Sequence, residues 1–143
     1  MKLPDGTEVN PDEIESEPLS PEQRLYKENI LDHYRNPRNK KIVEGGLHAH
    51  DKNPFCGDEL EVYVIVEKGR VADIGFQGNG CAISQASMSM LTRKLRGKTL
   101  EEIQKLDQEF ILDMLNIPIG IVRRKCAMLG LRVTQQALEA QNA

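Results

Sequence analysis

Apolar residues recur at every second position between Glu59 and Glu67, and most of them are β-branched. This period of two is typical of a β-strand with one buried face. Lys68-Gly69-Arg70 then predicts a turn, and Val71 to Phe76 predicts a returning strand that the segment Gln77 to Gly80 should end. A short extended segment near Leu47 to His50 comes before both. The pattern predicts a β-meander.

Helical patterns flank this meander. Ser20 has a proline directly after it and a glutamine three residues on, which is the signature of a capped helix start. The predicted helices run from Ser20 to about Tyr34, from Cys81 to about Arg96, from Thr99, and from Asp107 to about Leu115, and Pro118 precedes a final helix. One face of the last helix should carry Val122, Cys126, Leu129, Val133 and Ala137.

The chain has 143 residues and is 39% hydrophobic, which suits one globular domain. Residues 1–19 hold six acidic side chains against one lysine. We therefore expect a flexible acidic tail over residues 1–19 and a single domain over residues 20–143.

The formal net charge is −3, and the chain lacks tryptophan. Nucleic-acid binding usually needs a basic excess and aromatic platforms, so we do not expect it here. No apolar run approaches a membrane span, and the first residues form no signal-peptide core. We expect a cytoplasmic protein without a membrane partner, whose three cysteines stay reduced and available for metal or sulfur chemistry.

The segment Asn53-Pro54-Phe55-Cys56-Gly57-Asp58 places a thiol and a carboxylate two residues apart in a loop before a strand. Gly57 would let the backbone turn so that both side chains face one point, as a metal site requires. The alternative is a small buried cysteine beside an ordinary turn aspartate.

The other two cysteines each have a functional and a structural interpretation. Cys81 stands where a helix should begin, and there the helix dipole and unpaired amides would favour its thiolate. Cys126 follows the basic run Arg123-Arg124-Lys125, which would favour its thiolate and attract an acidic partner surface. Both cysteines could equally be packing residues.

The separations between the cysteines, 25 and 45 residues, are too long for one zinc knuckle. A shared site would have to be assembled by folding. Among the histidines, His33 lies within the first helix, while His48 and His50 alternate on the extended segment before Cys56. His48 or His50 could serve as a ligand, but we expect solvated or hydrogen-bonded histidines.

Four motifs occur together in this chain: Ile30-Leu31-Asp32-His33-Tyr34-Arg35-Asn36-Pro37-Arg38-Asn39, Asn53-Pro54-Phe55-Cys56-Gly57-Asp58, Gly80-Cys81-Ala82-Ile83-Ser84 and Arg124-Lys125-Cys126-Ala127-Met128-Leu129. The combination closely resembles the IscU/SufU family and the N-terminal domain of NifU, over about residues 22–140. The resemblance implies a SufE/NifU-like α/β domain of the α+β type, with a small three-stranded antiparallel sheet packed against several helices.

The resemblance also implies a function. Members of this family are scaffolds rather than turnover enzymes: they take persulfide sulfur from a cysteine desulfurase of the IscS, SufS or NifS type, combine it with iron, and pass a labile cluster, commonly 2Fe-2S, to recipient apo-proteins. Carried over by motif, the ligands are Cys56, Asp58, Cys81 and Cys126, and Cys126 is the persulfide acceptor. Zinc in the cluster-free form and a homo-oligomer are both compatible with the resemblance.

Two features keep alternatives open. Lys125 stands where many scaffold members have a histidine, as in SufU-like proteins, yet the long insertion of SufU-like proteins between the last two cysteines is absent. The alternatives are a zinc-dependent SufU-type sulfurtransferase, in which Cys126 leaves the metal to accept sulfur, and a structural zinc module. The chaperone-recognition motif Leu-Pro-Pro-Val-Lys is also replaced, by Ile117-Pro118-Ile119-Gly120-Ile121.

Overall fold

The computed structural model describes residues 20–53 and 57–139. Three strands, β1 (Leu47–Lys52), β2 (Glu59–Glu67) and β3 (Arg70–Asn79), form an antiparallel sheet in the order β1-β2-β3. The meander and the α+β class predicted above are therefore confirmed. The predicted acidic tail lies outside the described residues.

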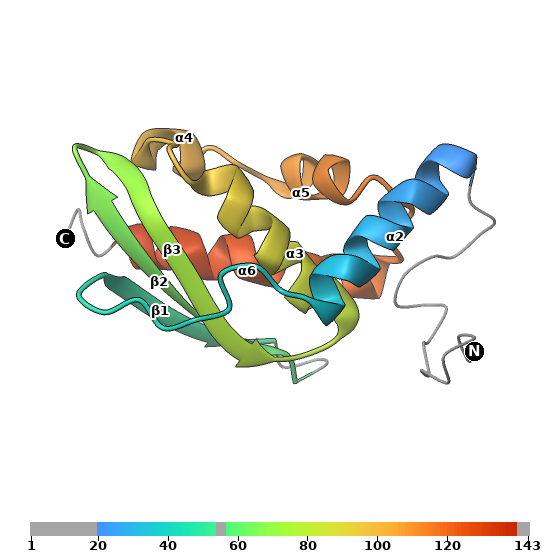
Figure 1. Ribbon diagram of the computed structural model, residues 1–143, viewed down its shortest axis with the longest axis horizontal. Helices are drawn as coiled ribbons and strands as arrows, with labels where there is room; N and C mark the ends of the chain where they lie inside the picture. The colour runs from blue at the N-terminus through green and yellow to red at the C-terminus, as the bar shows by residue number, and fades with distance from the viewer. Residues whose placement is uncertain (1–19, 54–56, 140–143) are drawn as a thin grey trace.

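Five helices complete the described part of the chain. They are α2 (Pro21–Arg35), α3 (Ala82–Leu95), α4 (Leu100–Gln104), α5 (Gln108–Leu115) and α6 (Ile121–Glu139). The long helix α6 packs against β1 and β2, and α3 lies between α6, β3 and α2 (Figure 1). The helices thus form a layer on one face of the sheet.

The predicted helix starts are confirmed. Ser20 caps α2 with both bonds of a capping box: its hydroxyl accepts from the amide of Gln23, and its amide donates to the Gln23 side chain. Thr99 and Asp107 cap α4 and α5 through their side-chain oxygens. Each of these helices therefore begins where a local polar side chain satisfies its first free amides.

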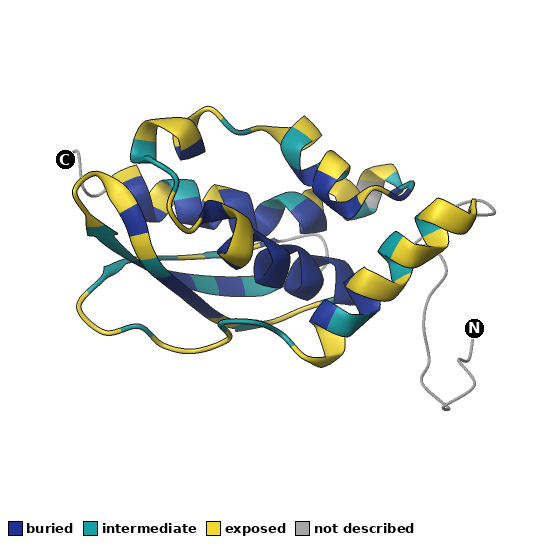
Figure 2. Ribbon diagram, turned by 45° about the horizontal axis from the view of Figure 1, so that its top comes forward, coloured by how far each residue is buried: buried dark blue, intermediate teal, exposed yellow. Residues whose placement is uncertain are grey.

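The core lies between the sheet and the helix layer. Most inward residues of β2 and β3 are buried, as are the α3 residues that meet them (Figure 2). On α6, the predicted apolar face is confirmed for the residues whose side chains are described: Cys126, Leu129, Val133 and Ala137. Nearly all of α3 is buried, because the sheet, α2, α5 and α6 all pack against it.

Strand β3 is longer than predicted. It does not end at Phe76 but continues to Asn79, with Gly78 paired to Leu60. A Cβ atom at Gly78 would lie 2.1 Å from the carbonyl oxygen of Glu59, and the φ angle of this glycine is +142°. The glycine that suggested a strand end instead lets two strands approach closely. The extension carries the chain directly to Cys81.

No helix in the described part of the chain combines the length and apolar character that crossing a membrane requires.

Candidate metal centre

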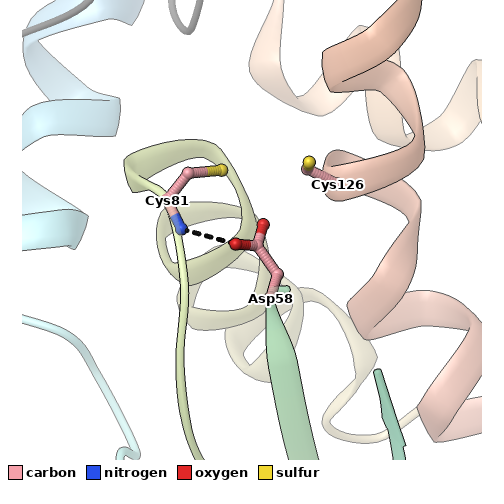
Figure 3. A group of neighbouring side chains, drawn as sticks. All are labelled: Asp58, Cys81 and Cys126. Atoms are coloured by element: carbon pink, nitrogen blue, oxygen red, sulfur yellow. Dashed lines mark hydrogen bonds between the residues drawn. The ribbon is translucent and has the colours of Figure 1, made fainter. Parts of the chain in front are cut away.

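Three predicted ligands come together at one end of the sheet. Ligand atoms of Asp58, Cys81 and Cys126 all lie within 4.8 Å of one another (Figure 3). Asp58 directly precedes β2, Cys81 caps α3, and Cys126 lies in the second turn of α6. Cys56, the fourth predicted ligand, falls outside the described residues. Tertiary folding therefore unites side chains that stand 23 and 45 positions apart in the sequence.

Asp58 is held by a closed backbone turn. The amide of Asn53 donates to the Asp58 carbonyl at 2.7 Å, and the amide of Gly57 donates to the Asn53 carbonyl at 2.8 Å. Gly57 has a φ of +74°, which confirms that the turn uses the conformational freedom of glycine. The Asp58 side chain is buried, and its Oδ1 accepts a 3.0 Å hydrogen bond from the amide of Cys81.

Gly80 makes this approach of Asp58 to α3 sterically feasible. A Cβ atom at Gly80 would lie 2.5 Å from the hydroxyl oxygen of Ser84 and 2.8 Å from the carboxyl carbon of Asp58. Real Cβ atoms do not come so close to other heavy atoms, so a side chain here would push Asp58 or Ser84 away. The small residue before Cys81 is thus part of the architecture of the site.

Cys81 caps α3 through its sulfur, as its predicted place at a helix start suggested. Its Sγ accepts from the Ser84 amide at 3.5 Å, and the Ser84 hydroxyl donates to the Cys81 carbonyl at 3.1 Å. The expectation that this position favours the thiolate is wrong for the metal-free protein. Burial, reinforced by the Asp58 carboxylate, raises the pKa of the Cys81 thiol above its usual value despite the opposing effect of Ser84.

Cys126 is fully buried, and two polar side chains approach its sulfur. Arg123 Nη1 lies 3.8 Å and Asn53 Nδ2 lies 3.7 Å from Sγ. A guanidinium and an amide N–H both stabilise negative charge on sulfur. Cys126 therefore lies on the apolar face of α6 and within the ligand cluster at once.

The sequence interpretation missed Asn53 and Gly80 as residues of this site. Asn53 stands in the quoted motif, but nothing local shows that its amide reaches α6, 73 residues away. Gly80 was interpreted as a strand end. In both cases the only signal in the sequence was that the residue stands within a few positions of a predicted ligand.

The histidines lie elsewhere. The ring of His33 is buried, with Nδ1 2.7 Å from the Ser89 hydroxyl. His48 and His50 lie on the outer face of the sheet, with Nε2 3.3 Å and 3.6 Å from the carboxylates of Glu61 and Glu59. Among the described residues, the ligand cluster thus consists of one carboxylate and two sulfurs.

This donor set fits a transition metal. Bonds of about 2.3 Å to sulfur and 2.0–2.2 Å to oxygen place two ligand atoms of one tetrahedral ion roughly 3.3–3.8 Å apart. The ligand atoms of Asp58, Cys81 and Cys126 lie within 4.8 Å of one another, so an ion between them would have to draw them closer. Thiolates select iron-sulfur clusters and zinc, whereas magnesium and calcium prefer oxygen ligands.

Comparison with known proteins identifies similar chains. The chain is 38% identical over 86 residues to the zinc-dependent sulfurtransferase SufU of Bacillus subtilis, an alignment that covers 60% of this chain and 58% of SufU. It is 34% identical over 117 residues to the iron-sulfur cluster assembly scaffold protein IscU 1 of Archaeoglobus fulgidus, which covers 80% of this chain and 74% of that protein.

Solved structures include a similar fold. The crystal structure of an iron-sulfur cluster assembly scaffold protein for the SUF system from Fervidobacterium islandicum matches with a TM-score of 0.68 and 26% identity, over 81% of this chain and 98% of that one. The model of the NifU-like N-terminal domain matches residues 25–143. With that match over most of its length, and with relatives of more than 30% identity, the chain belongs to the NifU-like N-terminal domain family.

Proposed function

We infer that this protein is an iron-sulfur cluster assembly scaffold. The observation that carries the inference is the convergence of Asp58, Cys81 and Cys126 within 4.8 Å, from three separate segments of the chain. Relatives with the same family domain, such as IscU 1 of Archaeoglobus fulgidus, carry the scaffold name. The protein acts as a carrier, and the cluster is its cargo.

We propose Cys56, Asp58, Cys81 and Cys126 as the ligands of a labile cluster of the 2Fe-2S type. Thiolates hold iron and sulfide firmly, and a single carboxylate among them is a harder and more exchangeable ligand. A cluster that must leave benefits from that weaker bond, whereas an electron carrier would more simply use four cysteines. Zinc suits the same donor atoms when the cluster is absent.

Sulfur enters, in this proposal, as persulfide from a cysteine desulfurase. The Cys126 thiolate attacks the outer sulfur of the desulfurase persulfide, a new S–S bond forms on Cys126, and the desulfurase cysteine leaves as a thiolate. The Arg123 guanidinium and the Asn53 amide beside Sγ support the attacking thiolate. Burial and the Asp58 carboxylate raise the pKa of the Cys81 thiol, which lowers the thiolate fraction of that residue. Recipient apo-proteins then take the finished cluster.

The test is anaerobic reconstitution with a cysteine desulfurase, cysteine and ferrous iron. We expect iron and acid-labile sulfide in equal amounts on the protein, and transfer of both to an apo-ferredoxin. Cys81→Ser and Cys126→Ser should abolish stable assembly, whereas Asp113→Ala, an exposed aspartate on α5, should leave it unchanged. Assembly of the same cluster on both cysteine variants would contradict the proposal.

A zinc-dependent sulfurtransferase is the second candidate. It is supported by the name of the Bacillus subtilis relative and by Lys125 beside the proposed acceptor cysteine. In that case zinc-loaded protein should accelerate desulfurase turnover in the absence of iron, and chelation should stop it. A scaffold should instead show cluster transfer that depends on iron and is inhibited by excess zinc.

A further inference from the structure

A second group of metal-ligating side chains lies on the outer face of the sheet. His48, His50 and Lys52 are exposed at alternate positions of β1, and the strand register places them opposite Tyr63, Glu61 and Glu59 of β2. Successive side chains of a strand point to opposite faces. Leu60 and Val62 point into the core, so Glu59 and Glu61 share the outer face with the histidines.

Each histidine lies beside one carboxylate, so the four side chains form two neighbouring His–Glu pairs. His48 Nε2 lies 3.3 Å from Glu61 Oε2, and His50 Nε2 lies 3.6 Å from Glu59 Oε2. The shorter distance is that of a long hydrogen bond between His48 and Glu61. Nitrogen and oxygen ligands at about 2.0–2.2 Å from one tetrahedral ion are roughly 3.3–3.6 Å apart.

Contacts with Tyr63 orient part of this His–Glu group, and a recess lies beside the rest of it. The His48 ring stacks on Tyr63, with ring centroids 5.1 Å apart, and the Tyr63 hydroxyl donates to Glu61. These contacts orient one imidazole and one carboxylate, as outer partners do in metal sites. Beside them is a recess of about 250 Å³ lined by His50, Glu59, Glu61, Gln77, Gly78 and Asn79, which leaves room for an ion and its waters.

We propose that His48, His50 and Glu61, with Glu59 beside them, bind a divalent first-row transition-metal ion such as Zn²⁺ or Fe²⁺. Two histidines at alternate positions of one strand point the same way, and Glu61 lies directly opposite His50 and diagonal to His48. In their present rotamers the four side chains form two separate His–Glu pairs, so binding one ion requires them to rotate toward one another. Their heads are 36–50% exposed, so rotation onto one ion meets little packing resistance.

This site is separate from the Asp58, Cys81 and Cys126 centre and does not depend on the scaffold function. Helices α3 and α6 carry the two sulfurs on the covered face of the sheet, whereas the histidines lie on the opposite face. Imidazole and carboxylate ligands accept first-row divalent ions, while Mg²⁺ prefers oxygen ligands alone. The site should therefore distinguish Zn²⁺ from Mg²⁺.

The test is a calorimetric titration of the reduced protein with Zn²⁺, carried out in the presence of excess Mg²⁺. The His48→Ala/His50→Ala variant should lose one class of binding site or bind there at least about tenfold more weakly, because losing even an outer partner of a metal ligand costs about 10- to 100-fold in affinity. Glu61→Gln should weaken the same site. Glu67→Gln, an exposed glutamate on the same strand, is the matched control and should change nothing.

Paramagnetic Co²⁺ locates the ion independently of stoichiometry. In amide NMR spectra the signals of His48, His50 and Glu61 should broaden separately from those of Ser84 and Ala127, which report on the cysteine centre. The variants' far-UV circular dichroism and denaturation midpoints check that they fold. The proposal is overturned if the double-histidine variant binds Zn²⁺ as the parent does, if Mg²⁺ displaces Zn²⁺ from the outer face, or if Co²⁺ leaves the β1 signals unchanged.

Discussion

The backbone amide of Cys81 donates a 3.0 Å hydrogen bond to Oδ1 of Asp58. One proposed ligand is thereby fixed by the backbone of another, across 23 residues of sequence (Figure 3). The carboxylate is held at the helix start before any metal arrives. Its second oxygen is the one that Figure 3 shows pointing toward the two sulfurs.

Asp58 has two separable roles: it accepts a hydrogen bond from the Cys81 amide, and it is a proposed metal ligand. Asp58→Asn keeps an oxygen that can accept from Cys81, whereas Asp58→Ala removes both the acceptor and the charge. We expect Asp58→Ala to lower the free energy of unfolding by about 1–3 kcal/mol, and Asp58→Asn to lower it less. Both should slow cluster release to an apo-ferredoxin, because each removes the exchangeable carboxylate. Denaturant unfolding and transfer kinetics measure the two effects, and unchanged transfer in both variants would contradict the role of Asp58.

Gly80→Ala tests the steric basis of the site. Its Cβ would meet the Asp58 carboxyl group and the Ser84 hydroxyl, so we expect a loss of about 1–3 kcal/mol in unfolding free energy and weaker metal binding. Gly120→Ala is the control, because a Cβ there meets no atom within 4 Å. Equal Zn²⁺ affinity of Gly80→Ala and Gly120→Ala would show that the close approach does not matter.

Cys126 should be the first sulfur acceptor. The Arg123 guanidinium and the Asn53 amide approach its sulfur, while burial and Asp58 raise the pKa of Cys81. After brief incubation with desulfurase and cysteine, mass spectrometry should find the added sulfur on the peptide that contains Cys126. Normal loading of Cys126→Ser, with sulfur appearing first on Cys81 or Cys56, would refute this order.

Lys125 should contribute to desulfurase association. It is exposed next to the buried Cys126, whereas the neighbouring Arg124 donates to the Ile119 carbonyl at 3.2 Å and supports the turn before α6. Lys125→Glu should therefore slow association mainly at low salt, with little effect on folding. Arg132→Glu, farther along α6, is the control. If the association rate changes neither with the substitution nor with ionic strength, electrostatic steering by Lys125 is excluded.

His33 should make stability depend on pH. Burial beside Ser89, together with the positive charge of Arg38, lowers its pKa below the value of about 6.5 expected in the unfolded chain. The unfolded chain then binds more protons between these two values, so the free energy of unfolding falls as pH drops below about 6.5. His33→Gln should reduce this fall. Parallel stability curves for His33→Gln and the parent would contradict the assignment.

The sequence by itself determined the local elements. A period of two fixes which residues of β2 face the core, because a strand turns its side chains alternately. Ser20, Thr99 and Asp107 fix helix starts, because their side chains bond to amides two or three residues away. Family motifs also pointed to Asp58, Cys81 and Cys126, since ligand chemistry depends on residue type.

Only the tertiary structure decided how these parts interact. The pKa of Cys81 depends on burial and on Asp58, which outweigh the helix start that favoured the thiolate. The contact between Asn53 and Cys126, and the strand pairing that carries β3 through Gly78 to Asn79, join segments that no local pattern relates. The outer-face group of histidines and glutamates likewise depends on the register between β1 and β2. Desolvation and long-range contacts arise only when the chain packs, so they cannot be predicted from the periodicity of the sequence.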